Sequence, residues 1–479
     1  MYDIAIIGAG VIGGMTAREL SKYNLNICIL EKENDVAMGA TKANSAIVHA
    51  GFDAKEGSLK AKLNVRGSLL MPAVCEELGV KYKNNGSLVI GFNDQDRETI
   101  NELLKRGKRN GVEGLRIVEK QELKHMEPNL SDNVLCALYA PTGAIVCPYE
   151  LTIAAIGNAM DNGVNLKRNF DVKSIETTAI GYKIKSKNDS VEVRFVINCA
   201  GIYSDEIAKL VGDDSFEVHA RRGEYILLDK ECGDVVSHTI FRTPTKMGKG
   251  ILVSPTVDQN LLLGPTSVDI DDKDDKSTTQ DGMGQIIENA QENLSFVSLS
   301  KTITSFCGLI AVGSTGDFII NSPKKQFINA AGIESPGLSA SPAIAEYIIK
   351  LLSEQGLTLT KKQNYNPIRE SVHKFFEASI DQKNKIIKDN PAYGRIVCRC
   401  EGITEGEIID AIRRNPSACD LDGVKRRTRA QMGRCQGGFC GPYIAEILSR
   451  ELGVPFENVT KFGGKSKVNI AKTKGGKIL

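Results

Sequence analysis

Residues 1–31, MYDIAIIGAGVIGGMTARELSKYNLNICILE, set the architecture of the whole chain. The apolar run at 3–7 predicts a short buried strand, and a glycine-rich turn follows it directly. A helical segment at 15–23 and a second apolar strand at 26–30 come next. The order strand, tight turn, helix and strand predicts an α/β fold.

The glycines of this turn stand at positions 8, 10 and 13, in the spacing G-x-G-x-x-G. Gly8 permits the turn, Gly10 lets the backbone approach a pyrophosphate, and Gly13 lets the helix pack on the strand. Glu31 comes eighteen positions after Gly13, and its carboxylate can accept hydrogen bonds from ribose hydroxyls. These four residues predict a Rossmann-like dinucleotide site, against the alternative of a glycine-rich turn in an unrelated α/β sheet. The fingerprint alone does not distinguish FAD from NAD.

The composition bounds the class of protein. A chain of 479 residues exceeds what one hydrophobic core usually serves, so we expect two or three packing units. With 41% hydrophobic residues, 25% charged residues and a net charge of +2, the chain is typical of a globular protein that acts on small molecules, not on nucleic acid. The apolar start at 2–15 lacks a basic leader and is too short to span a bilayer. We therefore expect no signal peptide, no transmembrane helix and a cytoplasmic protein.

A second segment, GATKANSAIVHAG at 39–51, is small, polar and turn-rich. With it the chain resembles the D-amino-acid oxidase-like FAD oxidoreductases, in the branch of the glycerol-3-phosphate and L-2-hydroxyglutarate dehydrogenases. The resemblance implies that the cofactor is FAD, that this segment runs along its pyrophosphate and flavin, and that His49 lies near the isoalloxazine ring. It also implies cofactor contacts from Thr41, Lys42, Asn44 and Ser45.

Two later segments extend the resemblance in the order of the family, VINCAGIYSDEIAKLVG at 196–212 and FINAAGIESPGLSASPAIAEYIIKLL at 327–352. Each is an apolar strand that breaks into a loop and then a helix, and each taken alone could be a generic element of an α/β fold. The second helix is expected to begin near Gly337 and Leu338 and to point its N-terminus at the flavin pyrimidine, where a partial positive charge favours the reduced flavin. The resemblance adds further cofactor contacts from Lys32, Val172, Ala200, Gly201 and Gly308.

Between these segments lie β-rich stretches at 85–92 and about 215–310. The resemblance implies that they form an antiparallel sheet, inserted into the flavin domain, that covers the reactive face of the flavin. The fold class is therefore α/β, with an α+β substrate domain. The expected domains are an FAD-binding domain at 1–80, 141–212 and 316–355, a substrate domain at 81–140 and 213–315, a partly helical linker at 356–392, a small helical cysteine domain at 393–455 and a mobile basic tail at 456–479.

Four of the twelve cysteines form two close pairs within 398–440, whereas the other eight, among them Cys419 between the pairs, are scattered and are expected to be free thiols. The first pair has the spacing C-x-C and the second C-x-x-x-x-C, so four soft thiolates can converge on zinc, copper(I) or an iron–sulfur cluster. Neither pair has the C-x-x-C spacing of structural zinc sites. The segment also resembles the 2Fe-2S domain named after bacterioferritin-associated ferredoxin, with zinc or no metal as the alternatives. That resemblance implies the ligands Cys398, Cys400, Cys435 and Cys440.

A basic run accompanies these cysteines. A 2Fe-2S cluster with four thiolates gains negative charge on reduction, so nearby cations would favour its reduced form. The alternative is a solvated helix face or a docking patch for a partner. The run consists of Lys425, Arg426, Arg427, Arg429 and Arg434.

The pairing of FAD with a one-electron cluster favours a dehydrogenase over an oxidase, because a hydride can reach the flavin and electrons can then leave singly through iron. Oxidation of a secondary alcohol also needs a base, and His49 is the histidine that stands in a flavin-adjacent motif. An anionic substrate needs positive anchors, for which we expect Arg222, Lys246 and Lys249. The family places an arginine directly after the Gly-Leu of SFCGLIAV, where this chain has Ile310, so one expected anchor is missing.

Three functions follow as hypotheses. The first is a catalytic subunit similar to that of anaerobic glycerol-3-phosphate dehydrogenase, which forms dihydroxyacetone phosphate and passes electrons to partner subunits or to quinone. A second flavoprotein is one candidate partner, and membrane association would be at most peripheral, through a partner. The second hypothesis is an L-2-hydroxyglutarate, other 2-hydroxyacid or amino-acid dehydrogenase. The third is an electron-transfer or redox-sensing subunit without a substrate of its own.

Overall fold

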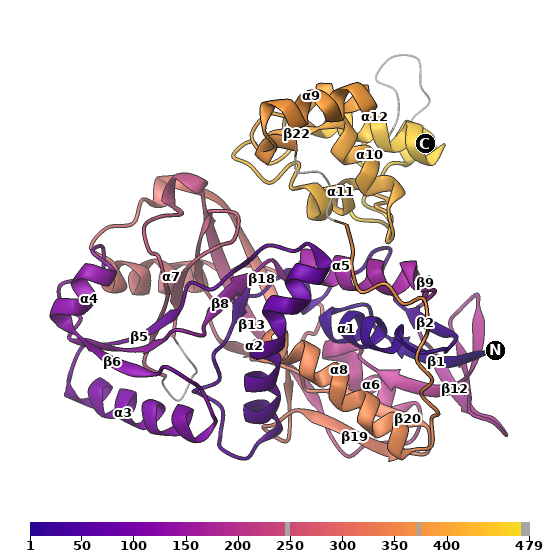
Figure 1. The fold of residues 1–479 in the computed structure, drawn as a ribbon, viewed down its shortest axis with the longest axis horizontal. Coiled ribbons are helices and arrows are strands. Elements are labelled where there is room, and N and C mark those ends of the chain that lie inside the picture. Colours follow the sequence, from indigo (N-terminus) through magenta and orange to yellow (C-terminus); the bar gives the residue numbers. More distant parts are fainter. Residues whose placement is uncertain (245–249, 371–374, 471–479) are drawn as a thin grey trace.

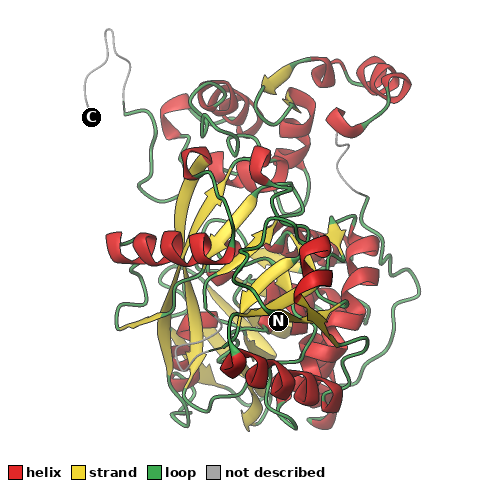
Figure 2. Cartoon of the chain, turned by 90° about the vertical axis from the view of Figure 1, so that its left-hand side faces the viewer, coloured by secondary structure: helices red, strands yellow, loops and turns green. Residues whose placement is uncertain are grey.

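The computed structural model describes residues 1–244, 250–370 and 375–470. Two sheets with their helices form the body, and a smaller domain sits above it, reached by a segment of chain that runs up the side of the body (Figure 1). Figure 2 shows that this upper domain consists of helices joined by loops, with a short pair of strands. The expected anchors Lys246 and Lys249 lie outside the described residues. Within the described ranges, no helix combines the length and the apolar character needed to cross a bilayer.

The first sheet is built around the amino-terminal strand. Its strands are β1 Tyr2–Ile7, β2 Ile27–Leu30, β9 Asn165–Lys167, β10 Ser174–Thr177, β11 Tyr182–Lys185, β12 Ser190–Asn198, β19 Ile319–Lys324 and β20 Phe327–Ala331. They run in the order β10-β11-β12-β1-β2-β9, with β20 paired to β12 and β19 to β20. The pairings that join β20, β12, β1, β2 and β9 are parallel, as a Rossmann-like start predicts.

Both faces of this sheet are covered, which explains the fully apolar strands. Residues 4–7 of β1 are all buried, as expected for a parallel strand with layers on either side. One face carries the mutually packed helices α1 Val11–Leu20, α2 Leu59–Leu78, α5 Pro148–Asp161 and α8 Gly337–Glu354. On the other face, Phe170 and Tyr182 pack against Ala5 and Ile7.

The second sheet lies beside the first. Its strands are β5 Ser87–Gly91, β6 Arg116–Glu119, β7 Cys136–Ala140, β13 Val218–Leu228, β14 Thr239–Arg242, β15 Leu252–Pro255, β16 Leu261–Gly264, β17 Val268–Ile270 and β18 Thr302–Gly313. They run in the order β17-β13-β16-β15-β14-β5-β7-β6, with β18 along β13, and the pairing of β14 with β5 is parallel among otherwise antiparallel pairings. α3 Asp94–Arg109 covers one face, and α4 Lys120–Met126 with α7 Gln280–Asn293 covers the other.

A small third sheet connects the two halves of the body. It consists of β3 Ile47–Val48, β4 Tyr82–Lys83 and β8 Ala144–Val146, in the order β3-β8-β4. β3 lies inside the 39–51 segment, which is called the flavin-adjacent loop from here on. This small sheet therefore fixes that loop relative to the start of α5. The α/β fold with an inserted, largely antiparallel sheet is confirmed.

The upper domain contains the cysteine cluster. Its elements are α9 Ile380–Asp389, β21 Ile396–Cys398, β22 Ile403–Thr404, α10 Glu405–Arg413, α11 Leu421–Thr428 and α12 Gly441–Leu452. Tyr393 is buried and hydrogen-bonds to Asp410, while Val459 belongs to the apolar core of the domain. The domain therefore extends beyond the expected 393–455. Residues 375–394 and 456–467 pack with it instead of forming a linker and a mobile tail, because both segments contribute buried side chains and hydrogen bonds.

Buried ion pairs hold this domain on the body. Asp35, which follows β2, is 1% exposed and accepts hydrogen bonds from Arg426 and Arg427 of α11, the latter at 2.7 and 2.8 Å. Burial alone would raise the pKa of the Asp35 carboxyl, but the two guanidinium groups hold that pKa well below its ordinary value. One carboxylate therefore binds two guanidinium groups of α11 within the chain, at the contact of this helix with the body.

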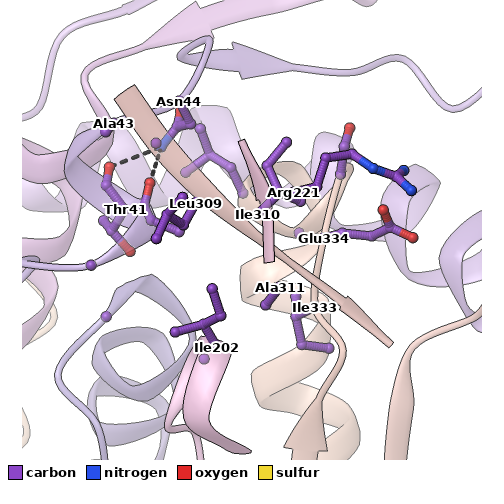
Figure 3. A pocket seen from close by; sticks show the side chains of 18 of the residues that line it. Thr41, Ala43, Asn44, Ile202, Arg221, Leu309, Ile310, Ala311, Ile333 and Glu334 are labelled. Atoms are coloured by element: carbon purple, nitrogen blue, oxygen red, sulfur yellow. Dashed lines mark hydrogen bonds between the residues drawn. The ribbon is translucent and has the colours of Figure 1, made fainter. Parts of the chain in front are cut away.

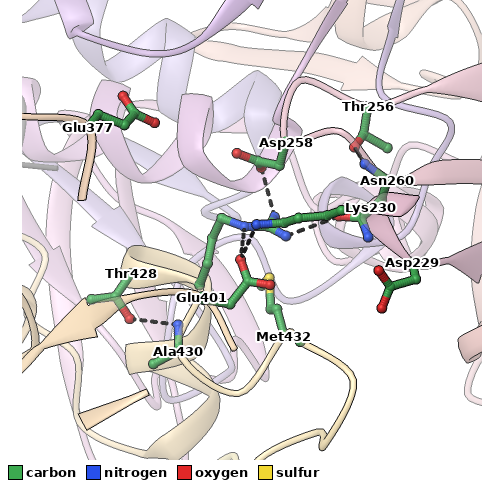
Figure 4. Close-up of polar contacts among 12 residues, drawn as sticks. Asp229, Lys230, Thr256, Asp258, Asn260, Glu377, Glu401, Thr428, Ala430 and Met432 are labelled. Atoms are coloured by element: carbon green, nitrogen blue, oxygen red, sulfur yellow. Dashed lines mark hydrogen bonds and ion pairs between the residues drawn. The ribbon is translucent and has the colours of Figure 1, made fainter. Parts of the chain in front are cut away.

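A second group of polar contacts joins the upper domain to the second sheet (Figure 4). Arg429 donates to Asp258 at 2.7 Å and to Glu401 at 3.0 Å, and Lys230 reaches Glu401 at 2.8 Å. Arg434 pairs with Asp229 and Glu231, in the turn that follows β13. The basic run is thus a docking patch, as one alternative held, but its partner is the chain's own body.

We expect Asp35→Ala to lower the free energy of unfolding by about 3–5 kcal/mol, because it removes the carboxylate to which both buried guanidinium groups are hydrogen-bonded. Urea unfolding followed by circular dichroism measures the loss. Asp132→Ala is the control, since its ion pair with Lys124 is solvent-exposed and should change stability little. Equal losses in the two variants would contradict the importance of the buried pair.

Candidate functional site

A cavity of about 1440 Å³ opens between the two large sheets. Its walls come from the glycine turn, the end of β2, the 38–55 loop, the turns after β12 and β20, and strands β13 and β18. His49 lines it as well. The expected cofactor residues that line it are Gly8, Gly10, Glu31, Lys32, Thr41, Lys42, Asn44, Ser45, Val172, Ala200, Gly201, Gly308, Gly337 and Leu338.

The glycine turn has the tight geometry that its spacing predicts. Gly8 has φ +104°, and a Cβ there would lie 2.4 Å from the carbonyl oxygen of Cys199. A Cβ on Gly13 would lie 2.0 Å from the carbonyl oxygen of Gly8. Gly13 therefore does not face the cavity; it allows α1 to approach β1, as the fingerprint requires.

The N-terminus of α1 opens onto the cavity. Gly10 caps the helix without a side-chain hydrogen bond, and the backbone N–H of Val11 donates to Thr41 Oγ1 at 3.0 Å. The first backbone N–H groups of a helix have no acceptor inside the helix, and the helix dipole adds a partial positive charge there. Because Gly10 and Val11 line the cavity, these groups can bind a pyrophosphate.

Glu31 closes one end of the nucleotide region. Its side chain accepts hydrogen bonds from the backbone N–H groups of Ala9 at 2.7 Å and Glu33 at 2.9 Å. Burial raises the pKa of the Glu31 carboxyl to about 7. The fixed carboxylate keeps lone pairs toward the cavity, where ribose hydroxyls can donate to it.

The 41–45 loop is held by its own side chains (Figure 3). Asn44 Nδ2 donates to the carbonyl oxygen of Thr41 at 2.8 Å, and Asn44 Oδ1 accepts from the backbone N–H of Ala46 at 2.8 Å. Burial, with Arg426 nearby, lowers the pKa of Lys42 to about 8. A cation that is destabilised in this way suits a site for a negatively charged group.

His49 lies at the start of α8. Its backbone N–H donates to Ser339 Oγ at 2.7 Å, and its Nε2 is 3.3 Å from Ser335 Oγ. The ring centroids of His49 and Phe241 are 5.6 Å apart. Pro336 caps α8 without a side-chain hydrogen bond, so the free N–H groups of this helix and the imidazole meet at one place.

The expected substrate anchor Arg222 is not in the cavity. It pairs with Asp275 on the other side of β13, whereas Arg221 lines the cavity and binds Asp269 at 2.7 Å. The reason is the two-residue period of a strand, which turns neighbouring side chains to opposite faces. Arg221 stands directly opposite Ile310 in the pairing of β13 with β18 (Figure 3).

Sequence reasoning missed several other residues that line the cavity. Side chains two residues apart in a strand share a face, so the position of Arg221 in β13 indicates Tyr225 as well. The hydroxyl of Tyr225 lies 3.1 Å from Ser45 Oγ. No local pattern marks Lys60, which comes from α2 and donates to Glu334 at 2.5 Å. Tyr203 and Lys273 complete this group near the nucleotide end.

The cysteines stand as two pairs in the upper domain. Cys400 Sγ and Cys435 Sγ are 3.6 Å apart, and a hydrogen bond from Cys440 lowers the pKa of Cys398 to about 6. Cys398 and Cys440 are 1% exposed, whereas Cys400 is exposed. In the part of the chain that the structure describes, no group of three or more Cys, His, Asp or Glu side chains surrounds one ion position.

A contact joins the cluster region to the flavin half of the body. The hydroxyl of Tyr149, in the first turn of α5, donates to Met432 Sδ at 3.5 Å. Tyr149 follows β8, whose Val146 donates its backbone N–H to Ala46 in the flavin-adjacent loop at 3.0 Å. Met432 precedes Cys435 by three residues, so a short path of protein atoms links the loop to the cluster ligands.

This fold and cavity define a flavin-dependent oxidoreductase that carries a separate cluster domain. Residues 3–351 match the family described as FAD dependent oxidoreductase (DAO), and residues 396–450 match the BFD-like 2Fe-2S binding domain. The chain belongs to this family of FAD-dependent oxidoreductases and contains a BFD-like 2Fe-2S domain.

Three known proteins illustrate the similarity. Glycerol 3-phosphate dehydrogenase of Caloramator mitchellensis is 49% identical over 476 residues, which cover 99% of each chain. L-2-hydroxyglutarate dehydrogenase of Homo sapiens is 32% identical over 284 residues, 56% of this chain and 61% of that protein. The structure of dithionite-reduced L-alpha-glycerophosphate oxidase from Mycoplasma pneumoniae with FAD bound matches with a TM-score of 0.73 at 31% identity, over 77% of this chain and 98% of that chain.

The residues present fit both cofactors. The N-terminus of α1 and the partly buried Lys42 suit the pyrophosphate of FAD, and Glu31 suits its ribose. Two pairs of thiols suit the four-cysteine ligation of a 2Fe-2S cluster.

We expect Glu31→Gln to weaken FAD binding about tenfold or more, because a hydrogen bond to a charged acceptor contributes about 1.5–3 kcal/mol. Wild-type affinity should fall as the pH is lowered from about 8 to about 5.5, since ribose hydroxyls favour the ionised carboxyl, whose pKa without FAD is about 7. Fluorescence titration of the apoprotein with FAD measures both effects. The variant should lose the pH dependence, and a wild-type affinity that ignores pH would contradict the role of Glu31.

Proposed function

We propose that this oxidoreductase converts glycerol 3-phosphate to dihydroxyacetone phosphate and sends the electrons to its 2Fe-2S cluster. The observation that carries the proposal is the near full-length similarity to the Caloramator dehydrogenase, which includes the cluster domain. FAD, held at the N-terminus of α1 and by Glu31, would supply a hydride acceptor for the carbon that bears the hydroxyl, and a 2Fe-2S cluster held by the four cysteines would supply one-electron acceptance.

The phosphate of the substrate is assigned to the cations beside Ile310. Arg221 and Lys60 both line the cavity, and Glu334 lies between them in reach of each. Cross-strand neighbours on one face of a sheet lie about 4.5–5.5 Å apart at Cβ. The Arg221 guanidinium can therefore reach the space that an arginine at position 310 would occupy, which compensates for the missing anchor.

The proton of the substrate hydroxyl is assigned to His49. Its imidazole is oriented by Ser335 and lies at the start of α8, in the wall of the cavity. An imidazole can accept a proton near neutral pH, and the positive end of α8 favours negative charge on the oxygen that loses the proton. Loss of the hydroxyl proton and of the hydride from the same carbon centre gives the ketone.

Electrons then leave toward a partner. The contact between Tyr149 and Met432 joins the flavin-adjacent loop to the cluster ligands and supports transfer within one chain. The acceptor is assigned to a separate electron-accepting subunit, for which a second flavoprotein is one candidate. Any membrane association would be peripheral, through that partner.

Anaerobic spectroscopy of the holoprotein tests the function. We expect glycerol 3-phosphate to bleach both the flavin band and the cluster absorption, and L-2-hydroxyglutarate to bleach neither. Bleaching by the hydroxyacid alone would assign the second hypothesis instead. An intact spectrum with both donors would favour the electron-transfer role.

Kinetics of three variants test the assigned residues. Arg221→Ala should raise KM for glycerol 3-phosphate about tenfold or more, because a charged hydrogen-bonding partner of the phosphate is lost. His49→Gln should lower kcat about 100-fold or more with a smaller change in KM, as expected for loss of a general base. Arg222→Ala is the control, since Arg222 faces away from the cavity. An unchanged KM in Arg221→Ala would remove Arg221 from the site.

A further inference from the structure

The cluster ligands are not equally covered. Cys398 and Cys440 are 1% exposed, whereas Cys400 reaches solvent next to Cys435. The side of the domain that carries Arg426 and Arg429 is occupied by the chain's own body. The solvent edge of the cluster is therefore at Cys400.

Large apolar side chains surround this edge. Phe439 is 82% exposed, Ile396 55% and Tyr443 50%. Contacts place them around the ligands: Phe439 donates its backbone N–H to the Cys435 thiol, and Arg395, next to Ile396, lies over the ring of Tyr443. Such exposed aromatic and aliphatic side chains at one place are typical of a protein interaction site.

The segments that carry the cluster ligands are basic, and Glu401, which follows Cys400, is itself paired with Lys230 and Arg429. The segments 395–400, RIVCRC, and 434–443, RCQGGFCGPY, contain all four ligand cysteines, three arginines and no acidic residue. Arg395 and Arg434 pair with carboxylates elsewhere in the chain. Arg399, between the two cysteines of the C-x-C pair, is exposed, and among the described residues it has no carboxylate partner. This rim attracts a negatively charged surface.

We propose that the face formed by Arg399, Cys400, Phe439 and Tyr443, the cluster face, docks a small acidic one-electron carrier protein. The inference deepens the proposed function, because it names the kind of acceptor. An apolar centre with a basic rim beside an exposed redox ligand suits a brief encounter with an acidic carrier, since such interfaces are small and steered by charge. A second copy of this chain would present the same basic rim, and like charges oppose that pairing.

Stopped-flow reduction of a model carrier tests the cluster face. The holoprotein is reduced with dithionite and mixed with the acidic soluble domain of cytochrome b5 or with basic cytochrome c. Arg399→Glu should lower the rate constant for cytochrome b5 at least about tenfold at low salt, and the difference should shrink as salt rises. Phe439→Ala and Tyr443→Ala should each lower it severalfold at every salt concentration. Reduction of cytochrome c by Arg399→Glu should be as fast as by the wild type or faster.

Controls separate docking from damage to the cluster. Arg109→Glu and Phe296→Ala change exposed residues of the same types on the substrate domain, and they should leave the rate for cytochrome b5 unchanged. The absorption of the cluster and its oxidation by ferricyanide should be unchanged in every variant. Tyr443→Ala, which alters no neighbour of a ligand cysteine, keeps the test valid if a variant next to a ligand fails to bind the cluster.

The outcomes distinguish this inference from the proposed function. Equal loss in the control variants, or no loss in Arg399→Glu and Tyr443→Ala, would overturn the cluster face as a docking site. A dimer in light scattering that these variants dissociate would assign the face to a second copy and also overturn it. If glycerol 3-phosphate does not reduce the wild type but the dithionite-reduced protein still shows the dependence on Arg399, the proposed function fails and the docking face stands.

Discussion

The carbonyl oxygen of Gly8 lies where a side chain at position 13 would begin, and this contact sets how closely α1 approaches β1. The close approach aims the first turn of α1 into the cavity and brings Val11 within hydrogen-bonding distance of Thr41. The loop that contains Thr41 then continues through β3 to His49. A single packing distance between backbone atoms therefore positions both the anion site and the reactive end of the cavity.

The cluster domain depends on the same region. Asp35 lies between Glu31 and the 41–45 loop, so the buried ion pairs with Arg426 and Arg427 attach the domain next to the nucleotide site. Buried ion pairs contribute little net stability, because desolvation offsets their attraction, but they require one geometry. In this protein that geometry keeps Met432 against Tyr149, and with it a fixed separation between the two redox sites.

The parts of the site that could be predicted are those that depend on short-range geometry. The roles of Gly8, Gly13 and Glu31 follow from spacing within one strand–turn–helix unit, and the fold class follows from the order of such units. Arg221 could not be chosen over Arg222, because that choice needs the face of β13, which its partner strands decide. The contact of the basic run with the body could not be predicted, because its partner Asp35 is almost four hundred residues away in sequence.

The insertion of the substrate sheet has a consequence for synthesis. β1 pairs with β12, β12 pairs with β20, and α8 packs on α1, so the nucleotide-binding sheet joins the start of the chain to residues 327–354. At about 5–20 residues per second, a ribosome needs roughly 20–70 s to make this much chain. During that time the apolar strand β1 lacks the complete sheet into which it packs. The nucleotide-binding sheet, and with it the full wall of the cavity, is therefore complete only after residues 327–354 have been made.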